Sequence, residues 1–435
     1  MSDERDRLNE LPGTELLAAV REDRVTVQDV AQSCLRRIEA REPVIRAFAH
    51  HDPDLVRRSA AALDQHRAPT PLRGLPVGVK DLLDTADQPS EFGSPIYAGR
   101  RPSADAAVVT RLRAAGALIL GKTVSTEFAL FHPGPTRNPL DPRHTPGGSS
   151  SGSAAATADK MVTVAVGTQT AGSVIRPASF CGVVGFKPTY GAINRRGVKV
   201  ISPTLDTVGL FGRHVADVAA VFRAVREGSA EVPRGTLPPT SRRRIGFLRT
   251  AEWDSADPQT RRALEQLVSD LAGLGHDMVE TRLPGDFDRL VAAQVTVMET
   301  ETARSLEVEF RDHRDLLSDS ARAVIERGRA WSAQDYAGAV SLAARCRARL
   351  VDVFHDVDGV LTPAAVGEAP AGLAFTGDPV FCRVWTLLHC PAMSLPLLHG
   401  PRGLPVGVQL VGPPGADDSL LGLADELMAT GPPRG

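Results

Sequence analysis

Gly167-Thr-Gln-Thr-Ala-Gly-Ser-Val-Ile-Arg-Pro177 is the most informative segment of this 435-residue chain. The apolar run Met161–Gly167 leads into it and has the composition of a buried strand. Small residues then end on Ser173, and glycine lets a backbone turn tightly and bring its N–H groups close to a ligand. Converging N–H donors beside a nucleophilic serine are what an oxyanion site requires. The segment therefore predicts a strand followed by a catalytic turn.

A second serine-rich segment, Gly147-Gly-Ser-Ser-Ser-Gly-Ser153, lies upstream. Its composition alone also fits a solvated Ser/Gly linker. It matches G-x-S-x-G with Ser150 as nucleophile, but that motif needs a buried strand before it, and the preceding Pro142–Gly147 cannot form one. His132 and His144 lie near enough in sequence to pair with a serine, although ordinary loop residues are the simpler interpretation. There is no P-loop lysine and no HExxH spacing.

Lysine is rare in this chain. Lysine and arginine together number 50, and the only lysines are Lys80, Lys122, Lys160, Lys187 and Lys199. Arginine keeps its proton in proteins, whereas a buried lysine can lose it and act as a base. Lys80 ends the apolar run Leu75-Pro-Val-Gly-Val-Lys80, which predicts a short strand. We therefore expect Lys80 and the two serine loops to form one hydrolytic site, and a surface ion pair with Asp81 or Asp84 is the alternative.

Strand and helix patterns alternate at both ends of the chain. Thr26 is a candidate cap for a helix whose apolar positions begin at Val27, and helical patterns also cover 106–115 and 258–273. Residues 286–356 are mostly helical in pattern, whereas 357–363 and 405–411 return to strand pattern. The predicted fold class is α/β: a large mixed β-sheet layered between helices, in a single domain with a helical insertion. Residues 230–245 are expected to form a surface linker.

Composition narrows the function classes. Apolar content is 42%, charged content 23% and net charge −2, so neither nucleic acid nor an anionic membrane is an expected partner. The 5 cysteines are scattered without a CxxC pair, which predicts reduced thiols and no zinc site. The charged N-terminus has no apolar segment behind it, and no run is long enough to span a membrane. A cytoplasmic enzyme is the expectation.

Three motifs together resemble the amidase signature family. They are Leu75–Asp81, Gly147–Ala156 and Gly167–Tyr190, joined by C-terminal elements at Pro391–Pro396 and Leu404–Gly412. The resemblance is strong over residues 70–215 and moderate over 355–430. It implies one amidase domain over residues 1–435, with a catalytic core at 70–215, a variable helical region at 253–356 and a C-terminal return at 357–430.

The resemblance implies a Ser–cisSer–Lys triad. Carried over by motif, Ser173 is the nucleophile, Ser149 the bridging serine after a cis Gly148–Ser149 peptide, and Lys80 the base. To accept a proton Lys80 must be neutral, so burial or positive neighbours must lower its pKa. The oxyanion hole is expected from the N–H groups of Thr170, Ala171, Gly172 and Ser173. Ser150 and Thr168 are expected as supporting hydroxyls, with backbone capping as the alternative. No metal or cofactor is expected.

The sequence determines the substrate preference less closely than the catalytic residues. The order of residues around Ser173 resembles the malonamidase branch, which implies that Arg176, with Gly148, contacts the substrate, as a bidentate partner for a carboxylate or polar carbonyl. An arginine that ties two loops together is the alternative. The chain departs from the common family pattern at Ala171 and Gln169, where many members have glycine and an acidic residue. The candidate pocket aromatics are Trp331, Tyr336, Phe375, Phe381 and Trp385, although aromatic residues at helical spacing more often pack in the core.

The expected function is hydrolysis of small amides through an acyl-enzyme, by a monomer or homodimer. Carbamate or urethane hydrolysis on the same triad is an alternative, because a carbamate carbonyl can undergo the same acylation. A glutamyl-tRNA amidotransferase A-type subunit, working in a complex, is a second alternative. That interpretation is disfavoured because Asp206-Thr207 stands where such subunits usually have Asp-Gln.

Overall fold

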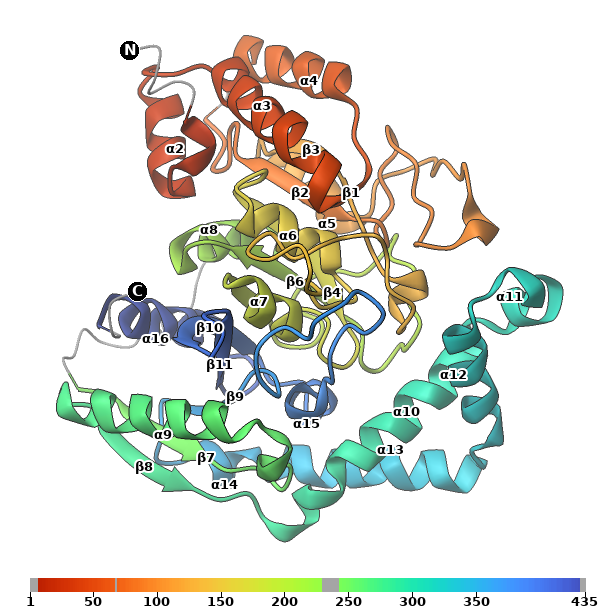
Figure 1. Cartoon of the computed structure of the whole chain (residues 1–435), viewed down its shortest axis with the longest axis vertical. Helices are drawn as coiled ribbons and strands as arrows, with labels where there is room; N and C mark the ends of the chain where they lie inside the picture. The colour runs from red at the N-terminus through yellow and green to blue at the C-terminus, as the bar shows by residue number, and fades with distance from the viewer. Residues whose placement is uncertain (1–6, 67–68, 229–241, 431–435) are drawn as a thin grey trace.

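The computed structural model describes residues 7–66, 69–228 and 242–430, and its centre is one mixed sheet of 11 strands (Figure 1). The strands follow the spatial order β1-β3-β2-β4-β6-β5-β10-β11-β9-β7-β8. Their bounds are β1 Phe48–His50, β2 Pro76–Lys80, β3 Leu118–Thr123, β4 Val164–Gln169, β5 Val184–Lys187, β6 Thr207–Gly212, β7 Arg244–Leu248, β8 Asp277–Thr281, β9 Gly359–Pro363, β10 Ala392–His399 and β11 Pro405–Val411. β2 is parallel to both of its neighbours, β3 and β4, whereas β4 and β6 are antiparallel. The predicted α/β fold class is confirmed.

Local sequence explains where many helices begin. Thr26 forms a capping box with Asp29 at the start of α3 (Val27–Ile45), as its hydroxyl and the Asp29 carboxylate each accept the other residue's backbone N–H. Pro258 occupies the first turn of α9 (Pro258–Gly273), where its missing N–H costs nothing. The remaining bounds are α2 Gly13–Arg21, α4 Pro53–Gln65, α5 Ala107–Ala114, α6 Ser151–Ala158, α7 Ile175–Cys181, α8 Val215–Val225, α10 Leu290–Ser305, α11 Glu307–Asp312, α12 Asp319–Ala330, α13 Ala333–Ala348, α14 Leu350–Phe354, α15 Val380–Leu387 and α16 Asp417–Thr430.

Alternation along the central strands divides the core between the two faces of the sheet. On β4, Val164 and Val166 belong to a cluster that includes α5, α8 and α16. Ala165, between them, belongs to a second cluster that includes α3, α6 and α7. Because successive side chains of a strand point to opposite faces, the sheet is covered by helices on both sides.

The helices of the middle segment form an arm that extends from the sheet (Figure 1). α10, α13 and α15 share a third apolar cluster with β9 and β11, which fixes the arm to the sheet. The segment 253–356, predicted as helical, also contributes one strand, β8, which pairs in parallel with β7 at the edge of the sheet. Strand β8 was not predicted from the sequence, because Asp277–Thr281 is only partly buried and lacks the apolar run of a central strand.

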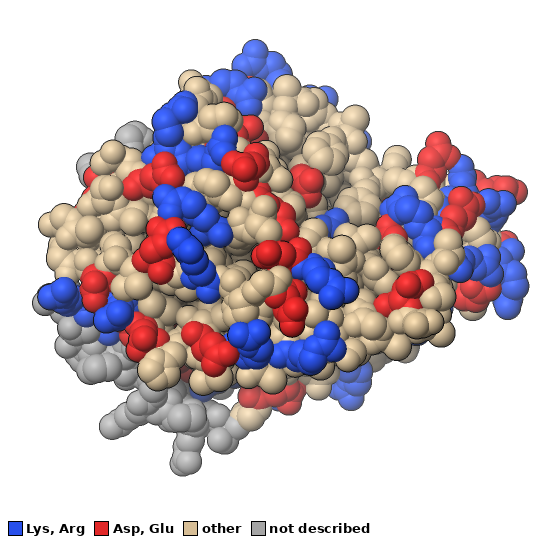
Figure 2. Space-filling model, turned by 90° about the horizontal axis from the view of Figure 1, so that it is seen from below, with Lys and Arg blue, Asp and Glu red and all other residues tan. Residues whose placement is uncertain are grey.

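Of the predicted linker at 230–245, residues 230–241 lie outside the described residues, and β7 already begins at Arg244. Among the helices that the structure describes, none is both long and apolar enough to cross a membrane. Basic and acidic side chains are interspersed on the face seen in Figure 2, in agreement with the net charge of −2.

Candidate active site

Strand alternation directs Lys80 toward the face covered by α6. Val77 and Val79 of β2 belong to the cluster on the other face, so Lys80, one residue further, points to the opposite side. Ser149 and Ser150 come directly before α6 on that side. The strand and the helix thus bring residues 69 positions apart in the sequence into contact.

Lys80 is fully buried and its amine contacts only hydroxyl groups. Nζ lies 2.7 Å from Ser149 Oγ, 3.1 Å from Ser150 Oγ and 2.8 Å from Thr168 Oγ1. No carboxylate within the described ranges lies at ion-pair distance from it. The surface ion pair considered as the alternative is therefore not formed, and both expected supporting hydroxyls contact the amine.

Burial lowers the pKa of Lys80 to about 7, and the negative charge of Asp206 opposes this shift. Asp206 is itself buried, which raises the pKa of its carboxyl. A neutral amine is thus accessible to Lys80 near neutral pH. This is the protonation state that a general base requires.

The Ser149 loop packs tightly around this amine. The peptide bond between Gly148 and Ser149 is cis, as the resemblance implies. A Cβ added to Gly167 would lie 2.7 Å from Ser150 Oγ, so glycine on β4 leaves the space in which the Ser150 hydroxyl approaches the lysine. Ser150 Oγ also donates to the Thr168 carbonyl oxygen at 3.2 Å, and it contacts no histidine among the described residues. The geometry thus gives no support to a Ser150–His pair.

The turn after β4 leaves a set of backbone N–H groups free. Within the described part of the chain, the N–H groups of the four residues Thr170 to Ser173 make no hydrogen bond. The N–H groups of the next two residues are hydrogen-bonded: Val174 N and Ile175 N donate to Gln169 Oε1 at 2.8 and 3.0 Å. Gln169 is therefore the residue that shapes the turn, and the sequence showed it only as a departure from the family pattern.

Ser173 lies in this turn with its side chain almost buried, 6% exposed. Its hydroxyl makes no hydrogen bond to any described residue, including Ser149. The structure thus brings Lys80, Ser149, Ser150 and Thr168 into direct contact, and it places Ser173 in an adjoining pocket.

That pocket is very small, with a cavity volume of about 10 Å³. It is lined by Ala129, Leu130, Phe131, Thr170, Ala171, Ser173, Arg176, Ile201, Met298 and Pro379. None of the aromatic residues suggested by the sequence lines it; Phe381 and Trp385 are buried in the core, and Phe375 is 57% exposed. Phe131 and Met298 were missed because they come from a loop and a helix without catalytic motifs.

Arg176 is a buried cation at the edge of this pocket. Its Nη2 donates to the Gly148 carbonyl oxygen at 2.6 Å and to Thr376 Oγ1 at 3.3 Å, so it does tie two loops together. Its Nε and Nη1 atoms are buried and have no protein partner among the described residues. Burial lowers its pKa to about 10. Since its remaining donors are unused, Arg176 also retains the capacity to bind an acceptor in the pocket.

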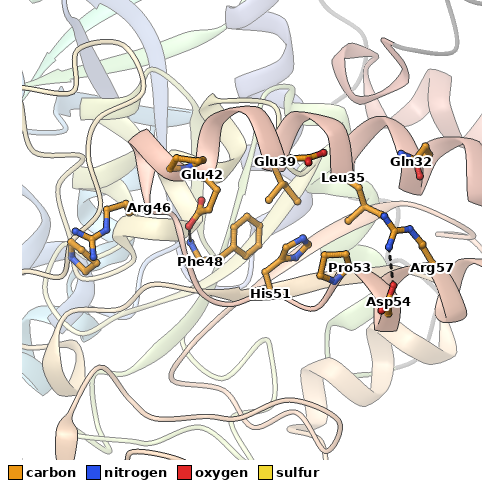
Figure 3. Close-up of a pocket in the computed structure, with 13 residues that line it drawn as sticks. Gln32, Leu35, Glu39, Glu42, Arg46, Phe48, His51, Pro53, Asp54 and Arg57 are labelled. Atoms are coloured by element: carbon orange, nitrogen blue, oxygen red, sulfur yellow. Dashed lines mark hydrogen bonds and ion pairs between the residues drawn. The ribbon is translucent and has the colours of Figure 1, made fainter.

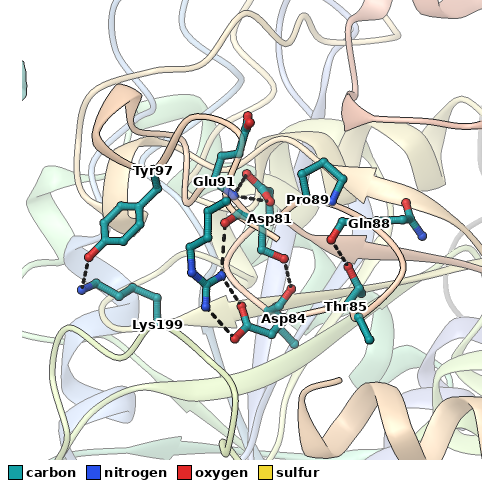
Figure 4. Close-up of polar contacts among 12 residues, drawn as sticks. Asp81, Asp84, Thr85, Gln88, Pro89, Glu91, Tyr97 and Lys199 are labelled. Atoms are coloured by element: carbon teal, nitrogen blue, oxygen red, sulfur yellow. Dashed lines mark hydrogen bonds and ion pairs between the residues drawn. The ribbon is translucent and has the colours of Figure 1, made fainter. Parts of the chain in front are cut away.

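The loop after Lys80 is held by a second buried lysine. Lys122 Nζ donates to the Leu83 carbonyl oxygen at 2.8 Å and lies 3.3 Å from Asp81 Oδ1. Asp81 in turn accepts from Glu91 N at 3.1 and 3.2 Å, so the loop folds back on the end of β2 (Figure 4). Unlike Lys80, Lys122 thus has a carboxylate partner, and its contacts hold this loop against the sheet.

A further groove near the N-terminus lies away from this site. It is an open groove between α3, α4 and β1 with Leu35, Phe48 and His51 in its lining (Figure 3). Its lining includes none of the predicted site residues.

Comparison with known proteins extends the likeness over nearly the whole chain. Residues 29–421 match the family model described as Amidase. The A subunit of glutamyl-tRNA(Gln) amidotransferase from Synechococcus sp. (strain RCC307) is 32% identical, over 93% of this chain and 94% of that protein. A solved amidase structure is 29% identical with a TM-score of 0.89, covering 97% of this chain and 100% of the other. Native peptide amidase from Stenotrophomonas maltophilia is 29% identical with a TM-score of 0.82, covering 97% of each chain.

Proposed function

The chain belongs to the amidase family and is an enzyme that hydrolyses amide C–N bonds, and we propose that it does so on small amides through an acyl-enzyme at Ser173. In this proposal Ser149 relays protons between Ser173 and Lys80. The observation that carries it is the fully buried Lys80 amine, which contacts Ser149 and has no ion-pair partner in the described chain.

The first half-reaction forms the acyl-enzyme. Neutral Lys80 takes the Ser149 hydroxyl proton while Ser149 takes that of Ser173, whose Oγ attacks the amide carbon. The developing oxyanion is stabilised by the free N–H groups between Thr170 and Ser173. When the C–N bond breaks, the proton returns from Lys80 through Ser149 to the leaving nitrogen.

The second half-reaction regenerates the enzyme. Water gives one proton to the same relay, its oxygen adds to the acyl carbon, and the bond to Ser173 Oγ breaks. Ser173 regains its proton, and the products are a carboxylic acid and an amine. Lys80 ends this step neutral, as it began.

The pocket supports a small substrate. Its cavity of about 10 Å³ leaves room for about one water molecule in this structure, so a compact acyl group is the substrate that displaces the lining least. The lining is mostly apolar apart from Thr170, Ser173 and Arg176. We propose that the two unpaired donor atoms of Arg176 contact a carboxylate or carbonyl oxygen of that group.

The test is covalent labelling combined with two lysine variants. A fluorophosphonate is expected to add once per chain, at Ser173, as located by peptide mass. Lys80→Met is expected to lower the rates of both labelling and amide hydrolysis by roughly 10²–10⁴, and Lys187→Met is expected to retain both. Lys187→Met is the matched control, because Lys187 is also fully buried but its amine contacts the backbone oxygens of Pro188 and Cys390. Labelling at another serine, or full activity of Lys80→Met, would contradict the proposal.

A second candidate is an amidotransferase A-type subunit, favoured by the 32% identity to such subunits over nearly the whole chain. The purified chain alone distinguishes the two. Hydrolysis of simple amides by the isolated chain supports a stand-alone amidase, whereas inactivity that is relieved only by partner subunits supports the second candidate.

Carbamates are the remaining alternative substrate class, because the same acylation would cleave them. Side-by-side kcat/KM values for a matched amide and carbamate of one acyl group measure this preference. We expect the amide to be preferred.

A further inference from the structure

One wall of the Ser173 pocket has an unusual backbone. Phe128 and Ala129 have φ values of 47° and 58°, in the left-handed region that non-glycine residues rarely adopt. Ala129, Leu130 and Phe131 from this short loop line the pocket. Residues in this conformation persist where the surrounding structure over-determines them, and such sites are often functional.

Hydrogen bonds hold this wall on several sides. Thr126 Oγ1 donates to the Leu130 carbonyl oxygen at 2.7 Å, and Thr126 N donates to the Ser149 carbonyl oxygen at 3.1 Å. The buried Glu127 carboxylate accepts from Ser94 Oγ and from Ser318 N, both at 3.1 Å. The wall is thus joined to the serine relay on one side and to the helical arm on the other.

Phe131 borders two hollows at the end of this wall. It lines the inner pocket with Ser173 and also an outer groove with His132, Ser318 and Ala374. The outer groove has a volume of about 450 Å³, against about 10 Å³ for the inner pocket. Phe131 also packs against both the main sheet core and the cluster that contains α10 and α13.

Because Phe131 lines both the inner pocket and the outer groove, we propose that it determines substrate length. In this proposal its ring closes the inner pocket toward the outer groove. The inference rests on the proposed acylation of Ser173. Substrates that fit the inner pocket react well, and longer chains are rejected where they would meet the ring. Removing the ring joins the inner pocket to the outer groove, which then receives the remainder of the chain.

The test uses alkylfluorophosphonates that differ only in chain length, an ethyl and a dodecyl probe. The readout is the ratio of their labelling rate constants, long over short. We expect a low ratio for the wild type, and an increase on the order of tenfold in Phe131→Ala, since pocket fit of single methylene groups already discriminates at that level. Phe131→Trp, which enlarges the ring system, is expected to lower the ratio.

Phe48→Ala is the matched control, because Phe48 is a half-buried phenylalanine on β1 in the remote groove of Figure 3. It should leave the ratio unchanged. Phe131→Leu keeps an apolar side chain against both clusters and supplies the measurement if the alanine variant fails to fold. An equal ratio in wild type, Phe131→Leu and Phe131→Trp would overturn the inference. Absence of Ser173 labelling by the ethyl probe in the wild type would instead overturn the proposed acylation.

Discussion

Lys80 and Lys122 show how one residue type takes two roles within neighbouring strands. Both lysines are fully buried, and burial lowers the pKa of each. Lys122 lies 3.3 Å from a carboxylate of Asp81, whereas Lys80 contacts hydroxyl groups only. The difference in partner, not in burial, makes Lys80 the candidate base.

The pH dependence of acylation is the first prediction. Because the pKa of Lys80 is about 7, the amine is protonated and inactive at lower pH. The labelling rate of Ser173 is expected to rise tenfold per pH unit below this pKa and to level off above it. The residual rate of Lys80→Met should be lower by roughly 10²–10⁴ and should lose this inflection. An inflection retained in the variant would assign the titration to another group.

The loop contacts of Arg176 and its proposed contact with the substrate can be separated by one variant. If its unpaired Nε and Nη1 bind a substrate carboxylate, Arg176→Ala should lose about 2 kcal/mol of binding, roughly thirtyfold in kcat/KM, for anionic amides only. If the contacts to Gly148 and Thr376 are its whole role, neutral and anionic amides should lose activity equally. Steady-state kinetics on an acid amide and its neutral methyl ester analogue distinguish these outcomes.

At the scale of elements, the turn between β4 and α7 depends on one side chain. Gln169 Oε1 accepts from Val174 N and Ile175 N, and its Nε2 donates to Thr386 Oγ1 at 2.9 Å. The sequence marks Gln169 as a departure from the family pattern. Its role emerges only from the packing of α15, which carries Thr386, against the turn.

Gln169→Ala tests this role. The change leaves two buried N–H groups without an acceptor, which costs roughly 1–3 kcal/mol each in unfolding free energy. Urea denaturation is expected to show a loss of about 3 kcal/mol, accompanied by a fall in kcat. Gln169→Glu keeps the acceptor oxygen and should recover most of both. Equal unfolding free energies of wild type and Gln169→Ala would show that Gln169 does not hold the turn between β4 and α7.

The contact of α6 with β3 depends on a glycine. A Cβ on Gly152 would lie 2.1 Å from the Ala47 carbonyl oxygen and 2.3 Å from Val124 N, so α6 would have to move away, together with Ser149 and Ser150. Gly152→Ala is expected to lose about 3 kcal/mol or more, by an order-of-magnitude estimate for overpacking. Gly422→Ala in α16 is the control, because no atom beyond the nearby backbone of α16 lies within 4 Å of its added Cβ. It should gain up to about 1 kcal/mol from helix propensity, as thermal unfolding can measure.

At the scale of the whole molecule, buried lysines couple folding to pH. In the unfolded chain Lys80 titrates near 10.5, and in the folded protein its pKa is about 7. Between these values the unfolded chain binds a proton that the folded protein does not, so stability rises with pH across this window. Lys187, whose pKa burial lowers to about 8, acts in the same direction.

Lys80→Met should remove one of these contributions. The slope of unfolding free energy against pH is expected to fall by up to about 1.4 kcal/mol per pH unit between pH ~7 and ~10. Below that window the variant should be more stable than the wild type, because it buries no ionisable amine. Denaturant unfolding at several pH values measures the slope, and an unchanged slope would mean that Lys80 keeps its proton in the folded protein.

Much of the local structure followed from residue patterns. The strand pattern at 405–411 and the helical pattern at 258–273 coincide with β11 and α9. Short elements with weak patterns, such as β8 and the half-buried β1, were not predicted, because their pairing partners rather than their own residues select the conformation.

The sequence by itself determined which residues are candidates to carry the chemistry. Three features identify them: the apolar run before Ser173, the two serine-rich loops and the scarcity of lysine. These features depend on the order and composition of the residues, and they can be recognised without knowing how the chain folds. The tertiary structure alone decided that Lys80 is fully buried beside α6, that Gln169 holds the turn, and that Phe131 lines the pocket with Ser173. These depend on contacts between segments far apart along the chain, and desolvation and cavity shape arise only when those segments pack together.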